Sequence, residues 1–245
     1  MANLGNFVFS YCFTGIGEAL PAMDRYGFDL CSIQDIAALK VTQTMGDRRG
    51  RSGIFDEGPI LTSDAVLCLP GDPPRAMLVK VSPLLLPSIK YIPDEGIVIG
   101  PAKIANEIDA KGLTWGEIYE SAIKELEKTN FFPNEEQISL SLENSVKFPV
   151  HEKSSFGEFV ELNDFKKNKL ISFILGAERD TYRKSLAMSN TQGIRIYPEV
   201  SENINGFEKP FVKQIVYGRD STTNISIHST ILFATRPFYV YGLVK

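Results

Sequence analysis

Alternating apolar and polar positions recur toward both ends of the chain and predict β-strands there. An early stretch, residues 6–13, reads NFVFSYCF. Residues 60–69 and 75–81 flank the turn PGDPP and together predict a β-hairpin. Four later stretches have the same character: GIRIYPEV, KPFVKQIVYG, TTNISIHSTILFAT and RPFYVYGLVK. The chain is therefore expected to be dominated by antiparallel strands.

Apolar residues three and four positions apart predict helices near the middle of the chain. The clearest helix is TWGEIYESAIKELEK, residues 114–128, in which Thr114 and Glu117 complete a capping box before an apolar stripe. A shorter helix is predicted over residues 102–110, soon after the apolar strand at residues 96–99.

Three stretches have a less distinct pattern. Residues 29–41 fit either a helix capped by Ser32 or a run into a strand. Residues 137–150, QISLSLENSVKFPV, alternate and predict a hairpin that turns at the central Glu-Asn pair. Residues 169–175 are also strand-like, because KLISFIL is almost wholly apolar.

No internal repeat, low-complexity segment or linker divides the 245 residues. The whole chain, residues 1–245, is therefore expected to form a single α+β domain. Its class is predicted to be mainly antiparallel β and barrel-like, with a few helices near the middle.

The composition is that of an ordinary globular protein, with 43% hydrophobic and 23% charged residues. A net charge of −4 and a pI of about 5.4 argue against general nucleic-acid binding, which needs a basic stripe. No uncharged apolar run approaches the roughly 20 residues of a membrane helix, and the amino terminus lacks the positive region of a signal peptide. A soluble protein without membrane contact is expected.

Cysteine and histidine content narrows the chemistry. Cys12, Cys31 and Cys68 have no C-x-x-C spacing and are expected to be reduced, mostly buried thiols of a cytoplasmic protein. His151 and His228 are the only histidines, whereas zinc hydrolases and two-histidine iron sites need clusters of them. The chemistry is therefore expected to fall to Lys, Arg, Asp, Glu or Tyr, without a cofactor.

Several cationic residues are candidates for contact with a substrate. Arg48, Arg49 and Arg51 lie in the loop GDRRGRSG, where they could clamp an anion over a pocket or simply face water. Lys103 follows the strand at residues 96–99 and is the candidate catalytic amine, provided that burial or a neighbouring cation lowers its pKa. An ordinary solvated lysine is the alternative.

A polar face is predicted for the strand NISIHSTI. His228 lies on the face opposite its neighbouring isoleucines, together with Ser226 and Thr230. That face could line a pocket or face water.

The hairpin at residues 60–81 also resembles the core of PD-(D/E)xK nucleases. In that pattern, a carboxylate on one strand and a carboxylate plus a lysine on the next hold Mg²⁺ and activate water. Asp64 and Lys80 match two of the three positions, but Leu78 occupies the place of the second carboxylate. Asp56 or Glu57 would have to replace it.

Three stretches together resemble the acetoacetate decarboxylase-like superfamily: YIPDEGIVIG, GIRIYPEV with KPFVKQIVYG, and TTNISIHSTILFATRPF. The resemblance loosely spans residues 91–238 and implies a cone-like β-barrel with an internal pocket for small keto acids. Ile108 and Asp109 fall about where that family has its paired lysines. A Schiff base would therefore have to form at Lys103 or Lys111.

The leading hypothesis is a lyase-like or decarboxylase-like enzyme, or a binder, that accepts a small carboxylate- or carbonyl-bearing substrate. Arginines of the 48–51 loop or Arg195 would hold the anion, His228 would line the site, and Lys103 would supply the amine. A divergent metal-dependent nuclease and a non-catalytic interaction protein are the alternatives. The sequence leaves a homo-oligomer open.

Overall fold

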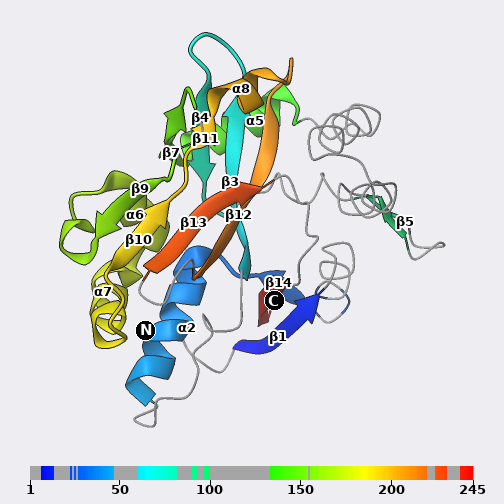
Figure 1. Cartoon of the computed structure of the whole chain (residues 1–245). Coiled ribbons are helices and arrows are strands. Elements are labelled where there is room, and N and C mark those ends of the chain that lie inside the picture. Colours follow the sequence, from blue (N-terminus) through cyan, green and yellow to red (C-terminus); the bar gives the residue numbers. More distant parts are fainter. Residues whose placement is uncertain are drawn as a thin grey trace, which may run out of the picture.

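The structure combines one large β-sheet with helices packed against it (Figure 1). This computed structural model describes residues 7–13, 23, 25, 27–46, 60–81, 90–92, 97–99, 133–153, 155–219, 224–230 and 238–244. The helices predicted over residues 102–110 and 114–128 lie outside these ranges and stay predictions.

The large sheet has ten strands within the described residues, and most neighbours in it are antiparallel. Among the described strands of this sheet, only β14 with β3 and β10 with β13 run parallel. Its strands are β1 (Phe7–Phe13), β2 (Phe28–Leu30), β3 (Ile60–Leu69), β4 (Arg75–Val79), β7 (Ser145–Phe148), β9 (Glu158–Glu161), β10 (Gly193–Ile196), β12 (Phe211–Arg219), β13 (Asn224–Thr230) and β14 (Phe238–Val244).

The strand order confirms an α+β fold but not a closed barrel. The main path runs β1-β14-β3-β12-β13-β10-β9, with β2 beside β14, and β4 and β7 branching from β3. Because β1 and β9 end this path, the sheet is open within the described residues. β14 joins β1 and β2 to β3 and so connects both early strands to the rest of the sheet.

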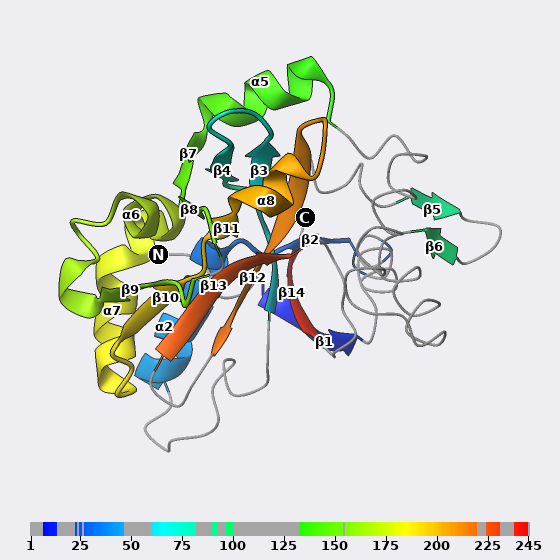
Figure 2. The same ribbon diagram turned by 45° about the horizontal axis from the view of Figure 1, so that its top comes forward.

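The described helices fall into two groups (Figures 1 and 2). Helices α2 (Ile33–Gly46), α6 (Lys169–Leu175) and α7 (Arg179–Met188) contact one another, whereas α5 (Glu135–Glu143) contacts β4 and β7. The smaller elements are the helix α8 (Ser201–Asn205), the 3₁₀ turns η3 (Leu162–Asp164) and η4 (Gly176–Glu178), the strand pair β5 (Lys90–Ile92) with β6 (Ile97–Ile99), and the strand pair β8 (Val150–His151) with β11 (Glu199–Val200).

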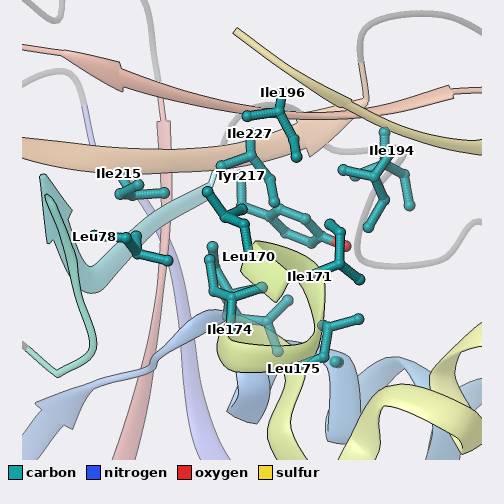
Figure 3. Close-up of a cluster of buried hydrophobic side chains, with 14 of the residues drawn as sticks. Leu78, Leu170, Ile171, Ile174, Leu175, Ile194, Ile196, Ile215, Tyr217 and Ile227 are labelled. Atoms are coloured by element: carbon teal, nitrogen blue, oxygen red, sulfur yellow. The ribbon is translucent and has the colours of Figure 1, made fainter. Parts of the chain in front are cut away.

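One face of the sheet forms the main core, and we call it the inner face. Alternate residues of three neighbouring strands point from it toward α6, because side chains alternate between the two faces of a strand. Figure 3 shows this packing, in which the sheet residues Ile194, Ile196, Ile215, Tyr217 and Ile227 meet Leu170, Ile171, Ile174 and Leu175 of α6. All nine side chains are buried, so α6 is held by apolar contacts on several sides.

The opposite face of the sheet, called here the outer face, has a smaller apolar cluster. Leu67 and Leu69 of β3 pack there with Val79 and Val212, and Ile138 of α5 packs against them. Farther along the sheet, toward β13, β10 and β9, the outer face is more polar.

The strand predictions were wrong over residues 137–143 and 169–175, because capped helices form there instead, whereas the second arm of the predicted hairpin is the strand β7. Residues 135–143 form α5, where Asn134 and Gln137 exchange side-chain and backbone hydrogen bonds of 2.8 and 2.9 Å in a capping box. Residues 169–175 form α6, where the Asn168 side chain accepts a 3.0 Å hydrogen bond from the Ile171 amide. In both places, an N-cap residue just before the apolar run stabilises the first turn of a helix.

The ambiguous stretch around residues 29–41 is resolved as the start of α2. Ser32 and Asp35 form the cap: the Ser32 amide donates to Asp35 Oδ2 at 2.9 Å, and the Asp35 amide donates to Ser32 Oγ at 3.2 Å. Ile33, Ile36 and Ala37 are fully buried, so this helix is fixed by both its cap and its packing.

Candidate functional site

Two of the residues selected from the sequence, Arg195 and His228, lie in the described part of the chain. The structure brings them to neighbouring strands, because β10 and β13 pair in parallel with Arg195 opposite Ser226. Since Ile194, Ile196, Ile225 and Ile227 face the core, Arg195 and His228 both lie on the outer face. The remaining candidates, Arg48, Arg49, Arg51 and Lys103, lie outside the described residues.

Arg195 is held flat against the outer face. Its guanidinium carbon lies 5.6 Å from the centre of the Phe159 ring, at cation–π distance. Its Nη1 donates a 3.0 Å hydrogen bond to the carbonyl oxygen of Phe156. The Phe156 side chain is 91% exposed, so a large apolar group stands beside the anchored cation.

Two glycines make this arrangement possible. A side-chain carbon at Gly193 would lie 2.7 Å from Cζ of Phe159 and closer still to the Val160 carbonyl oxygen. At Gly157, where φ is +78°, it would lie 2.7 Å from the Ile196 carbonyl oxygen and 3.2 Å from Cγ of Arg195. The absence of a Cβ at both positions therefore gives Phe159 and Arg195 their room.

His228 stands near Tyr197, with the two rings edge to face at 87° and 6.3 Å between centroids. Burial, and then the positive charge of Lys213, lowers the pKa of His228. The imidazole is therefore neutral at pH 7, with one nitrogen donating and one accepting. Lys213 is paired with Glu199, whose exposure is only 2%.

We call Phe156, Phe159, Arg195, Tyr197 and His228 the arginine ledge. Sequence reasoning selected Arg195 and His228 but missed the three aromatic residues. The alternating pattern of EFVE was visible, yet its register against GIRI, which sets Phe159 opposite Arg195, comes only from the fold.

Asp64, the proposed nuclease carboxylate, is engaged with the backbone. Its Oδ2 accepts a 2.7 Å hydrogen bond from the Ile33 amide, and its Oδ1 accepts a 2.9 Å hydrogen bond from the Val81 amide. The side chain is fully buried, and this burial raises its pKa to about 6. Asp64 thus holds the start of α2 against the end of β4.

Lys80, the second nuclease candidate, donates a hydrogen bond from its ammonium group to the side-chain oxygen of Gln34 in α2. Asp56 and Glu57, the proposed replacements for the missing carboxylate, lie outside the described residues. Within the described residues, no group of three or more His, Cys, Asp or Glu side chains could hold a metal ion. The nuclease alternative therefore gains no support from Asp64 and Lys80.

Cys31 and Cys68 are free, buried thiols, as composition predicted. Burial raises the pKa of both, so they stay protonated. Among the described helices, none is long and apolar enough to cross a membrane.

No family model matches the chain, and no curated protein matches it. Among solved structures, the chain is similar to one described as "Accommodation of massive sequence variation in Nanoarchaeota by the C-type lectin fold". The two chains are 12% identical, with a TM-score of 0.53, and the match covers 97% of this chain and 98% of the other. At this identity the likeness shows the fold alone, so the resemblance to the acetoacetate decarboxylase-like superfamily stays a prediction.

Proposed function

We propose that this chain is a binding protein that holds a carboxylate-bearing ligand at the arginine ledge. The observation that carries the proposal is the anchored Arg195 guanidinium, fixed over Phe159 and tied to the Phe156 carbonyl. Arginine suits carboxylates because its planar fork matches their two oxygens. Holding the side chain in place before binding reduces the entropy lost when the ligand arrives.

The neighbours of Arg195 support a recognition surface. Tyrosine and arginine are enriched among residues that dominate binding energy, and an exposed phenylalanine adds apolar contact area. The neutral His228 offers both a hydrogen-bond donor and an acceptor on the same face. A ligand with a carboxylate and an apolar or aromatic part would meet complementary groups.

The fold supports this proposal in a second way. The similar structure is described as accommodating massive sequence variation on the C-type lectin fold. We infer that variation in this chain would spare the buried core, because core substitutions usually destabilise a fold. In this chain the buried inner face would be the fixed part, and the ledge would be the part adapted to a ligand.

Titration with acetate, succinate and a small keto acid tests the proposal, with the ring resonances of His228 and the Arg195 side chain followed by NMR. Arg195→Ala is expected to weaken binding about tenfold or more, since a hydrogen bond to a charged group contributes about 1.5–3 kcal/mol. The affinity of Arg195→Lys should lie between those of the wild type and Arg195→Ala, because lysine keeps the positive charge but lacks the planar fork of arginine.

Arg183→Ala on α7 is the matched control and should leave the affinity unchanged. If no carboxylate shifts the ledge resonances, or if Arg195→Ala and Arg183→Ala bind equally well, the proposal is wrong.

The lyase hypothesis stays a prediction, since it depends on Lys103. Both hypotheses involve a carboxylate-bearing ligand, and they differ in whether an amine attacks its carbonyl. Borohydride trapping with small keto acids, followed by mass spectrometry, separates them: an adduct on Lys103 supports the lyase, and no adduct with retained binding supports a binding protein. A cytoplasmic location and a homo-oligomer likewise stay predictions.

A further inference from the structure

The centre of the sheet contains a buried irregularity between β3 and β12. Leu61 pairs with Val216 and Ala65 pairs with Gln214, so four steps along β3 are matched by two along β12. The additional residues of β3 belong to the polar stretch Thr62, Ser63 and Asp64, all of which are buried. An irregularity of this kind needs other partners for the backbone groups that leave the ladder.

Most polar groups at this irregularity have clear partners. Thr62 Oγ1 donates to the Ile215 carbonyl at 3.0 Å, and the Ser63 amide donates to the Cys31 carbonyl at 2.9 Å. Gln214 Nε2 donates to the Thr62 carbonyl at 2.9 Å. That last bond fixes the orientation of the Gln214 amide, because only its NH₂ can donate to a carbonyl.

Two oxygen atoms of this irregularity, Ser63 Oγ and Gln214 Oε1, have no hydrogen-bond partner within the part of the chain that the structure describes. Gln214 is 2% exposed and Ser63 is 9% exposed, so bulk water does not satisfy them. Buried polar atoms in folded proteins almost always have partners, and each exception needs an explanation. The two residues lie close together, since the Gln214 side chain bonds the Thr62 carbonyl, which belongs to the peptide group that joins Thr62 to Ser63.

We propose that Ser63 and Gln214 form a second binding site, for a small neutral molecule or group with an O–H or N–H donor. Gln214 Oε1 can only accept, so the bound group must donate to it. The Ser63 hydroxyl can donate or accept, which suits a water, an alcohol or a primary amide. Both side chains are uncharged and buried, and a buried ion without a counter-charge is unfavourable there. This site involves none of the residues of the arginine ledge.

Ser63→Ala tests the proposal through urea unfolding, because it removes one of the two oxygens and little else. If a bound group satisfies Ser63, the variant should lose about tenfold in its folding equilibrium constant, the usual scale for one lost hydrogen bond. A double-mutant cycle with Gln214→Met should then show non-additive losses, because one bound group contacts both residues. The hydrogen bond from Gln214 to Thr62 is lost both in Gln214→Met and in the double variant, so its loss cancels when the four proteins of the cycle are compared.

Two further measurements distinguish the sources of the donor. Wild-type protein that is unfolded, dialysed and refolded should regain its original stability if the donor is water, and should fall to the level of Ser63→Ala if it is a co-purified ligand. NOEs from water or ligand protons to the Gln214 side-chain amide report occupancy in the wild type directly. A Ser63→Ala variant as stable as wild type or more stable, together with the absence of such NOEs, would overturn the proposal.

Discussion

Asp64 and Arg195 show two different uses of a charged side chain on the same sheet. Asp64 is buried, and both of its carboxylate oxygens accept backbone amides from segments far apart in the sequence. Arg195 lies on the outer face, stacked on Phe159 beside the exposed ring of Phe156. The Asp64 side chain stabilises the fold through its hydrogen bonds, whereas Arg195 presents its charge near the surface. Resemblance to known families selected both as functional residues, and their burial and hydrogen-bond partners separate them.

Asp64→Ala should give the largest loss of stability, about 3 kcal/mol. It leaves the buried Ile33 amide and the partly buried Val81 amide without acceptors, and an unsatisfied buried group costs about 1–3 kcal/mol. Urea unfolding measures the change. Asp164→Ala, which removes only an exposed ion pair with Lys167, should change stability by less than about 1 kcal/mol. Equal effects of the two variants would contradict a structural role for Asp64.

The pH dependence of stability should identify Asp64 a second time. Burial is the main reason that the pKa of Asp64 is raised from 3.8 to about 6. Hydrogen bonds from the Ile33 and Val81 amides and the charge of Lys80 lower this pKa, and the negative charge of Asp35 raises it further. Between these two values, the folded state keeps a proton that the unfolded chain has lost. The free energy of unfolding should therefore decrease by about 2 kcal/mol from pH 4 to pH 7 on account of this group.

Asp64→Asn should remove that slope, whatever its effect on the absolute stability. The measurement is urea unfolding at a series of pH values for both proteins, with the difference between the two curves attributed to Asp64. Parallel curves would mean that another group titrates in this window.

Gly193→Ala should disturb the packing of the arginine ledge more than that of the main core. The added carbon would press on the Phe159 ring and the Val160 carbonyl, with an expected loss of about 1–2 kcal/mol. Because Phe159 supports Arg195, the variant should also weaken carboxylate binding. Gly206→Ala is a suitable control, since its nearest contacts are 3.4 Å or more away. A ledge that binds normally in Gly193→Ala would show that Phe159 does not position Arg195.

Arg195→Ala should have the smallest effect on stability among Asp64, Gly193 and Arg195 variants, about 1 kcal/mol, because the ring contact and the hydrogen bond that it removes lie at a partly exposed site. Its effect on the free energy of ligand binding should be at least as large as its effect on folding. Thermal unfolding with and without succinate checks both at once, since a bound ligand raises Tm. If Arg195→Ala lost much stability without ligand, Arg195 would be a residue that stabilises the fold, as Asp64 is.

The strands could be predicted from the sequence where one face is apolar and the other polar. In β13 the isoleucines alternate with Ser226 and His228, and Ile225 and Ile227 are the residues that pack in the main core. The same reasoning failed at α6, because only Lys169 and Ser172 interrupt the apolar run KLISFIL, and two polar positions were too few to reveal the helical spacing of its buried residues. The Asn168 cap was the available signal.

The sites were less accessible to sequence reasoning, because their partners are far apart along the chain. Asp64 reaches Ile33 and Val81 only after β3, α2 and β4 have packed together. The contact of Arg195 with Phe159 depends on the register of β9 against β10. A sequence pattern indicates which face a residue occupies but not which residue lies beside it on the next strand.

The position of β14 has a consequence for synthesis on the ribosome. Both β1 and β2 take their described partners from β14, and β14 pairs with β3 as well. Translation delivers β14 after every other described element, so β1 and β2 must wait with unpaired edges while the intervening chain is made. The pairing of β1 and β2 with β14 is therefore possible only once residues 238–244 have been made, and a nascent chain that stalls before residue 238 would present those edges to chaperones and proteases.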